Sequence, residues 1–326
     1  MKILITGGTG FLGQRLAHAL LKSEQKQIVT ELVLADVAPL RDAVLLADAR
    51  VRSVTGDLQS LLAERVLQGV DGMFHLAAAV SGECEADIDS GMRANLDTTR
   101  ALLDACRTLR QPPKLVFSSS LAVYGGAMYG GPEVIADNTL PMPQNSYGTQ
   151  KFVCEQLIAD YTRKGYIDGR SMRLPTVTVR PGKPNKAASS FMSGIIREPL
   201  AGVDAVCPVD PQTGVWITSP RYAVAGLIAA YETSAQVWGG RTALNLPGLS
   251  VRIAEIIAAL ERRAGARTAA RIRVQIDDTI SRIVGGWPWR FDTARARGLG
   301  LSGPAAIDDL VAEYVADYPE AVVRGE

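Results

Sequence analysis

The sequence predicts an α/β protein with a doubly wound parallel sheet and a smaller C-terminal α/β lobe. The apolar run at residues 3–5, Ile-Leu-Ile, has no polar alternation, which is typical of a strand covered on both faces. Glycines follow at once, and apolar residues then recur at helical spacing through Leu20. Strand and helix patterns keep alternating through the first half of the 326 residues, which implies right-handed βαβ units.

The turn after the first strand has the glycine spacing that a bound dinucleotide requires. Gly8 and Gly10 allow the backbone to turn sharply and approach a pyrophosphate, and Gly13 allows close packing of helix on strand. The phosphates then meet free N–H groups at the positive end of the helix dipole. The strand–turn–helix context favours this interpretation over a tight turn without a ligand. The residues that we expect at the cofactor are Gly7, Gly10, Phe11, Leu12 and Gly13.

The second strand, residues 31–36, ends in a carboxylate about 20 residues beyond the last glycine, where such sites bind the adenosine ribose. Asp36 accepts hydrogen bonds from ribose hydroxyls and repels a 2′-phosphate. Val37 and Ala38 follow it instead of a cation, so the sequence predicts NAD rather than NADP as cofactor. After the third strand, Asp57 and Leu58 are expected at the adenine edge.

Composition excludes several other classes of protein. The net charge is +1 with no basic block, so neither a nucleic acid nor an anionic membrane is indicated as a partner. A strand that begins within two residues leaves no room for a signal peptide, and no apolar run approaches the roughly 18 residues of a membrane span. The four cysteines show neither metal-ligand nor disulfide spacing, and there are two histidines. We therefore expect a cytoplasmic protein with reduced thiols and no metal site.

The remaining elements extend the same pattern. We expect residues 1–180 to form the NAD-binding domain and residues 181–326 to form mainly a substrate-binding lobe. Residues 125–145 are rich in Gly and Pro and predict a long loop at the mouth of the site. Further strands are expected at residues 51–55, 73–76, 114–118 and 171–180, and helices at 88–109, 147–164, 223–231 and 251–264.

Tyr147 and Lys151 are four residues apart on a predicted helix and therefore share a face. A free tyrosine has a pKa near 10, so a decrease of about three units, roughly 4 kcal/mol, is needed for a base at neutral pH. An ammonium at about 4 Å supplies about that much at an effective dielectric near 20. The positive nicotinamide ring adds to it. The pair thus predicts a phenolate that takes a hydroxyl proton as hydride leaves the same carbon.

Two strand ends are expected to complete this site, because open α/β sheets bind ligands at the carboxyl ends of their strands. Residues 117–120, Phe-Ser-Ser-Ser, place a hydroxyl where it can orient the reacting oxygen toward Tyr147. His75 precedes the small residues Ala77 and Ala78, which leave room for a cofactor. We interpret His75 as a packed strand-end residue rather than a general base. Asn95 can bridge the long helix to the active-site strands.

These residues together resemble the extended short-chain dehydrogenase/reductase family, which includes nucleotide-sugar epimerases and dehydratases. The match spans roughly the first 180 residues. The resemblance implies that the serine four residues before Tyr124-Gly125 is catalytic, which selects Ser120, with Lys151 also holding the nicotinamide ribose. It implies further cofactor contacts at Leu76, Ala77, Ala78, Asn95, Ser118, Tyr147, Lys151, Pro175, Thr176 and Val177.

A closer resemblance within the family lies at residues 79–83, 180–185, 187–200, 245–248 and 286–288. It implies NAD-dependent oxidation of the 2-hydroxyl of a four-carbon sugar acid. The substrate residues expected are Ser81, Ser120, Tyr147, Arg180 and Asn185. For Arg180 a salt bridge within the fold is an equal alternative to substrate binding. We interpret the tryptophans of the lobe as packing residues rather than as surfaces on which a sugar stacks. They are Trp216, Trp287 and Trp289.

Two other functions stay open at this level. A nucleotide-sugar epimerase or dehydratase with tightly held NAD uses the same triad, although Leu121-Ala122 replaces the Asp-Glu that dehydratases of the family usually carry. A non-catalytic NAD sensor shares the fold but has no need of the tyrosine and lysine. The family also implies a homodimer through apolar faces of the helices at 88–109 and 147–164.

Overall fold

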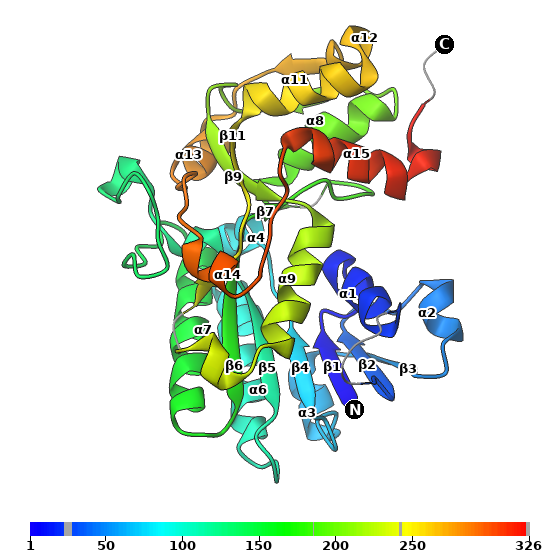
Figure 1. The fold of residues 1–326 in the computed structure, drawn as a ribbon, viewed down its shortest axis with the longest axis vertical. Coiled ribbons are helices and arrows are strands. Elements are labelled where there is room, and N and C mark those ends of the chain that lie inside the picture. The colour runs from blue at the N-terminus through cyan, green and yellow to red at the C-terminus, as the bar shows by residue number, and fades with distance from the viewer. Residues whose placement is uncertain (23–27, 185, 241–242, 324–326) are drawn as a thin grey trace.

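A computed structural model describes residues 1–22, 28–184, 186–240 and 243–323, and it contains a central parallel sheet with a lobe above it (Figure 1). The strand order β10-β6-β5-β4-β1-β2-β3 confirms the doubly wound Rossmann arrangement, because β1 lies between β4 and β2 and the chain runs outward in both directions. All its pairings are parallel. The strands are β1 (Lys2–Thr6), β2 (Glu31–Asp36), β3 (Val51–Thr55), β4 (Gly72–His75), β5 (Lys114–Ser120), β6 (Asp168–Leu174) and β10 (Leu244–Asn245).

Helices cover both faces of this sheet, which explains the lack of polar alternation in its strands. Ile3 and Ile5 pack with Leu16 of α1, whereas the intervening Leu4 belongs to the core on the opposite face with Leu102 of α6. One face is covered by α1 (Phe11–Lys22) and α9 (Pro220–Glu232), and the other by α3 (Leu58–Ala63), α6 (Thr98–Cys106) and α7 (Ser146–Arg163). Small flanking helices are α2 (Ala43–Ala47), α4 (Ser81–Ala86), α10 (Ala235–Trp238) and α14 (Ala294–Gly298).

The lobe has its own core and two small sheets. One sheet has the order β11 (Leu249–Arg252), β9 (Gly214–Thr218) and β7 (Thr176–Val177), and the other pairs β12 (Ile272–Val274) with β8 (Ala205–Cys207). The helices around them are α8 (Ser190–Leu200), α11 (Ile253–Ala264), α12 (Ala266–Ala269), α13 (Asp278–Gly285) and α15 (Ile307–Asp317). Between its lobe segments the chain returns to the main sheet with α9 and β10. The division of the chain at residue 180 stays a prediction.

Two predicted elements differ in the structure for identifiable reasons. The strand expected at 171–180 is divided at Pro175, which has no N–H for a ladder, and the chain there passes from β6 of the main sheet to β7 of the lobe. The helix expected at 88–109 contains a π-helical segment, Met92–Asp97, between α5 (Ile88–Gly91) and α6. Such segments are frequent at functional sites, and this one carries Asn95.

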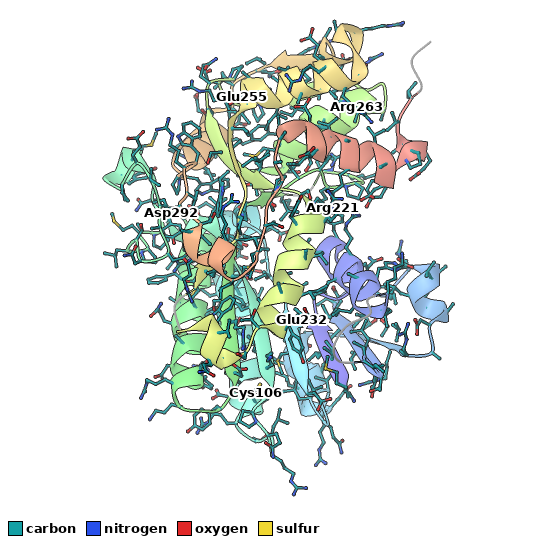
Figure 2. The ribbon with its side chains drawn as sticks, in the orientation of Figure 1. Cys106, Arg221, Glu232, Glu255, Arg263 and Asp292 are labelled. Carbon is teal, nitrogen blue, oxygen red and sulfur yellow. The ribbon has the colours of Figure 1, made fainter. Side chains whose placement is uncertain are left out.

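Ion pairs join the lobe to the helices of the sheet. Figure 2 shows Arg221 at the end of α9 nearest the lobe and Glu232 near its other end. Arg221 pairs with Glu313 of α15 at 3.4 Å, and the same carboxylate lies 4.0 Å from Arg15 of α1. Arg15 also bonds Asp317. Thus α15 contacts both helices on this face of the sheet. In the part of the chain that the structure describes, no helix is long and apolar enough to cross a membrane.

Candidate active site

A cavity of about 920 Å³ lies where the carboxyl ends of the sheet strands meet the lobe. It is large enough for a dinucleotide's reactive half and a small substrate, and ligand sites of this fold lie at this edge. The predicted residues that line it are Gly7, Gly10, Phe11, Leu12, Gly13, Asp36, Asp57, Leu58, Leu76, Ala77, Ala78, Ser81, Ser118, Ser120, Tyr147, Lys151, Pro175, Thr176, Val177 and Arg180. The structure therefore gathers residues from both halves of the chain around one space.

The glycine turn packs so closely against neighbouring backbone that it leaves no room for side chains. Gly7 has φ +69°, and a Cβ at this position would lie 2.8 Å from the backbone nitrogen of Ala77. A Cβ on Gly13 would overlap the carbonyl oxygen of Gly7. The turn therefore brings backbone within reach of phosphate oxygens at the N-terminus of α1. The residues present fit NAD at this end of the cavity.

The two carboxylates of the adenosine end have different local roles. Asp36 accepts hydrogen bonds from the backbone nitrogens of Thr9 and Ala38, both at 3.1 Å, which fixes it beside the glycine turn. Asp57 caps α3, and its hydrogen bonds from the Ser60 side chain and backbone lower the pKa of its carboxyl. The contact of Asp36 with ribose hydroxyls stays a prediction. Asp57 lines the cavity and also caps the N-terminus of α3.

Asn95 does not line the cavity but lies buried behind its wall. Its Oδ1 accepts from the nitrogen of Ala79 at 2.7 Å, and its Nδ2 donates to Gln150 of α7 at 2.7 Å. The bridge that the sequence predicts is present, and it joins the strand-end loop to the helix that carries Tyr147. The resemblance implies a direct contact between Asn95 and the cofactor, but in this geometry Asn95 does not reach the cavity.

His75 is a packed strand-end residue, as the sequence predicts. The ring is 1% exposed, and its two nitrogens lie 2.6 Å from the Thr6 hydroxyl and 2.9 Å from the Thr99 hydroxyl. Burial, and then the nearby Lys151 charge, lower the pKa of His75 to about 3. A neutral ring with both nitrogens occupied is excluded as the general base.

The catalytic candidates meet at the substrate end of the cavity. Tyr147 is in the first turn of α7, whose N-terminus is capped by the side chain of Asn145. The Ser120 hydroxyl lies close enough to the phenol of Tyr147 to lower its pKa. Lys151 is one turn further, with its Nζ 5.7 Å from the Tyr147 ring centroid and 2.8 Å from the carbonyl oxygen of Ser118. Serine, tyrosine and lysine therefore adjoin one another as the sequence predicts.

In the protein without a cofactor, the environment of Tyr147 favours the neutral phenol. Burial raises the pKa of Tyr147 to about 12, although the Ser120 hydrogen bond opposes this. The ammonium is directed at the Ser118 carbonyl, and burial lowers the pKa of Lys151 itself to about 8. Desolvation of the phenolate therefore outweighs the attraction of the ammonium, and a further positive charge is needed to release the proton.

At the lobe end of the cavity the structure shows functional candidates that the sequence analysis missed. Arg197 lines the cavity with Arg180, and Trp287, which packs against the lobe core as the sequence predicts, lines it as well. Arg197 is a charged residue in the apolar stretch of α8, and this was the available signal. Ser81 accepts a hydrogen bond from the nitrogen of Ala188 at 3.3 Å, which joins the cavity wall to the segment before α8. The predicted Asn185 lies outside the described residues.

Comparisons with known proteins identify the family of the chain. The model of the NAD dependent epimerase/dehydratase family matches residues 3–211. Two similar proteins are named D-erythronate dehydrogenase. The one from Cupriavidus necator is 48% identical over 97% of this chain and 98% of its own length. The one from Haemophilus influenzae is 42% identical over 97% and 99%.

Solved structures give the same fold. A crystal structure described as a nucleoside-diphosphate-sugar epimerase from Agrobacterium tumefaciens has a TM-score of 0.92 and 39% identity, covering 99% of this chain and 96% of that one. L-threonine 3-dehydrogenase from Trypanosoma brucei has a TM-score of 0.86 at 24% identity over 98% and 97% of the two chains.

Proposed function

Because the chain belongs to the NAD dependent epimerase/dehydratase family, we propose that it oxidises the 2-hydroxyl of a four-carbon sugar acid, D-erythronate, to the 2-oxo acid. It is an NAD-dependent oxidoreductase, and the finer assignment depends on the substrate. The observation that carries the reaction is that Tyr147, Ser120 and Arg180 line one cavity with the glycine turn. The names of the two relatives, at 48% and 42% identity, support the four-carbon acid.

The reaction balances with these residues alone and NAD. The glycine turn and Asp36 would hold NAD, which would supply the hydride acceptor for the oxidation and a positive charge. Ser120 holds the C2 oxygen toward Tyr147, which takes the hydroxyl proton as the carbon–oxygen double bond forms. Lys151 stays largely protonated below its pKa of about 8 and so opposes the burial cost of the phenolate. The products are the 2-oxo acid, NADH and a proton, which Tyr147 returns to solvent.

The function is tested by NADH formation at 340 nm with D-erythronate, L-threonate and D-glycerate. We expect saturable turnover on one of the four-carbon acids and weaker turnover on the three-carbon acid. No turnover on any of them, with NAD retained through gel filtration, would contradict the proposal. That result would favour the nucleotide-sugar epimerase, which the similarity to the Agrobacterium structure keeps as the alternative.

Asp36 is expected to set the choice of NAD over NADP. Replacing Asp36 with Ala removes the acceptor for the ribose hydroxyls and the charge that repels a 2′-phosphate. We expect the KM for NAD to rise about tenfold, since a hydrogen bond to a charged group contributes about 1.5–3 kcal/mol. The KM for NADP should fall, while kcat with saturating NAD stays nearly constant. An unchanged NAD/NADP preference would remove Asp36 from the ribose site.

The homodimer is a further part of this proposal. Ile88 and Val153, which belong to the two helices concerned, are 60% and 36% exposed in the single chain. Exposed apolar side chains on these helices support an interface between two copies of the chain.

A cytoplasmic location is also part of the proposal, and it rests on composition.

A further inference from the structure

Two guanidinium groups lie at the lobe end of the cavity, and one of them has no counter-charge among the described residues. Arg180 and Arg197 both line the cavity. The guanidinium of Arg180 is only partly exposed, and it forms no ion pair or hydrogen bond with any residue in the described ranges. Burial, and next the charge of Arg197, lower the pKa of Arg180. A desolvated cation that faces a second cation is unfavourable unless an anion comes to it.

The backbone of Arg180 is held by helix α8 on both sides of the residue. Its N–H donates to the Ser193 hydroxyl at 3.0 Å, and its carbonyl oxygen accepts from Nη1 of Arg197 at 2.6 Å. The guanidinium lies 5.9 Å from the ring centroid of Phe11, which also lines the cavity at the glycine turn. These contacts fix the backbone of Arg180 and place its guanidinium near the Phe11 ring. No described residue accepts a hydrogen bond from the guanidinium.

Arg197 is fixed in turn by its neighbour. Its Nη2 donates to Oε1 of Glu198 at 2.5 Å, and its side chain is 8% exposed. Glu198 is the carboxylate that pairs with it, so two guanidinium groups face one carboxylate at this position. Glu83 also lines the cavity, but it caps α4 through the nitrogen of Val80 and lies 4.0 Å from Lys186. Arg180, Arg197 and Glu198 together therefore carry a surplus of positive charge at the lobe end of the cavity.

We infer that Arg180 binds the carboxylate of the substrate and that Arg197 is the positioning residue that holds Arg180 and adds the second positive charge. The inference rests on the proposed function, because it names the group that recognises the acid. An arginine fork matches a carboxylate in two hydrogen bonds, which a neutral sugar or an amide cannot reproduce. The pair would thus make the enzyme specific for 2-hydroxy acids.

The alternative role of Arg180, a salt bridge within the fold, has no support in the described chain, because no acidic side chain there pairs with it. A purely structural role for Arg197 remains testable. Nη1 of Arg197 donates to the backbone carbonyl oxygen of Arg180, so this contact directly fixes the position of residue 180. Loss of the Arg197 side chain should therefore weaken recognition of the acid by Arg180. The reaction of uncharged analogues should stay largely unaffected.

The test compares D-erythronate with D-erythronamide, which keeps every hydroxyl and loses the negative charge. For Arg180→Gln we expect kcat/KM for D-erythronate to fall about 10- to 100-fold, mainly through KM, as for a lost charge-assisted hydrogen bond. The much weaker turnover of the amide should change less than about twofold, and Arg180→Lys should restore part of the loss. A similar decrease for acid and amide would show a structural role and overturn the inference.

Arg197 is tested by the same pair of substrates. We expect Arg197→Lys and Arg197→Gln to raise the KM for D-erythronate about tenfold with a smaller effect on kcat, because a lysine keeps the charge but cannot bond both the Arg180 carbonyl and Glu198. The KM for NAD should not change. Equal effects on acid and amide, or none, would contradict the positioning role.

Two controls separate this inference from the proposed function. Arg262→Gln removes an exposed arginine of the lobe that pairs with Asp308, and it should leave both substrates unchanged. Calorimetric binding of D-erythronate to the enzyme–NADH complex does not depend on turnover. Binding that Arg180→Gln abolishes, without turnover in the unmodified enzyme, would support the carboxylate site and refute the proposed reaction. Binding that survives Arg180→Gln would refute the site alone.

Discussion

Replacing Tyr147 with Phe is expected to lower kcat with D-erythronate by about 10³-fold, within the range that a positioned general base contributes. Tyr147 lines the cavity close to Ser120, whereas the carboxylate of Glu83, which also lines it, caps α4 through the nitrogen of Val80 and lies 4.0 Å from Lys186. His75 is excluded because it is buried, neutral and bonded through both ring nitrogens. Steady-state NADH formation measures the effect.

NAD binding provides the matched control for this variant. The aromatic ring is kept, so calorimetry should give an NAD affinity within about twofold of that of the unmodified protein, far below the tenfold that corresponds to 1.4 kcal/mol. Phe291→Tyr, a change of similar size outside the cavity, should leave kcat nearly unchanged. Activity of Tyr147→Phe within a few-fold of the unmodified enzyme would show that another group accepts the proton.

Local sequence patterns were sufficient for most of the fold. The Ile-Leu-Ile run predicts a doubly covered strand, and β1 has helices on both faces because alternate side chains enter different cores. The same kind of pattern could not separate β6 from β7, since apolar residues continue on both sides of Pro175. Which sheet a residue joins depends on partners far along the chain, here β10 for β6 and β9 for β7.

The site was predictable where a motif fixes backbone geometry, and less so where side chains meet across elements. The glycine turn, Asp36 and the Ser120–Tyr147–Lys151 group line the cavity as expected. The spacing of Tyr147 and Lys151 predicts that they share a helix face. It does not predict the direction of the ammonium, which bonds the carbonyl oxygen of Ser118. The charge of Arg197 in an apolar stretch was a local signal, but its contact with the carbonyl of Arg180, 17 residues away, could not be predicted from any local pattern.

A buried ion pair holds β6, the neighbour of the strand that carries Ser120, against the helix that carries Tyr147. Glu155 lies one turn beyond Lys151 on α7 and bonds Arg173 of β6 at 2.6 Å, with the two side chains 2% and 5% exposed. The same carboxylate accepts from the Ser119 hydroxyl at 2.5 Å, and Arg173 also bonds Tyr124. The pair therefore joins β5, β6, α7 and the start of the long loop directly beneath the catalytic residues.

Replacing Glu155 with Ala is expected to lower the free energy of unfolding by about 3–5 kcal/mol, because it leaves the Arg173 charge buried without a partner. Urea unfolding followed by circular dichroism measures this. The double variant Glu155→Met with Arg173→Met should recover a large part of the loss, since two apolar side chains need no counter-charge. Asp308→Asn, which breaks the exposed pair with Arg262, should leave the transition midpoint unchanged. If Glu155→Ala and the double variant were equally unstable, the loss would come from the cavity or from Ser119 rather than from the uncompensated charge.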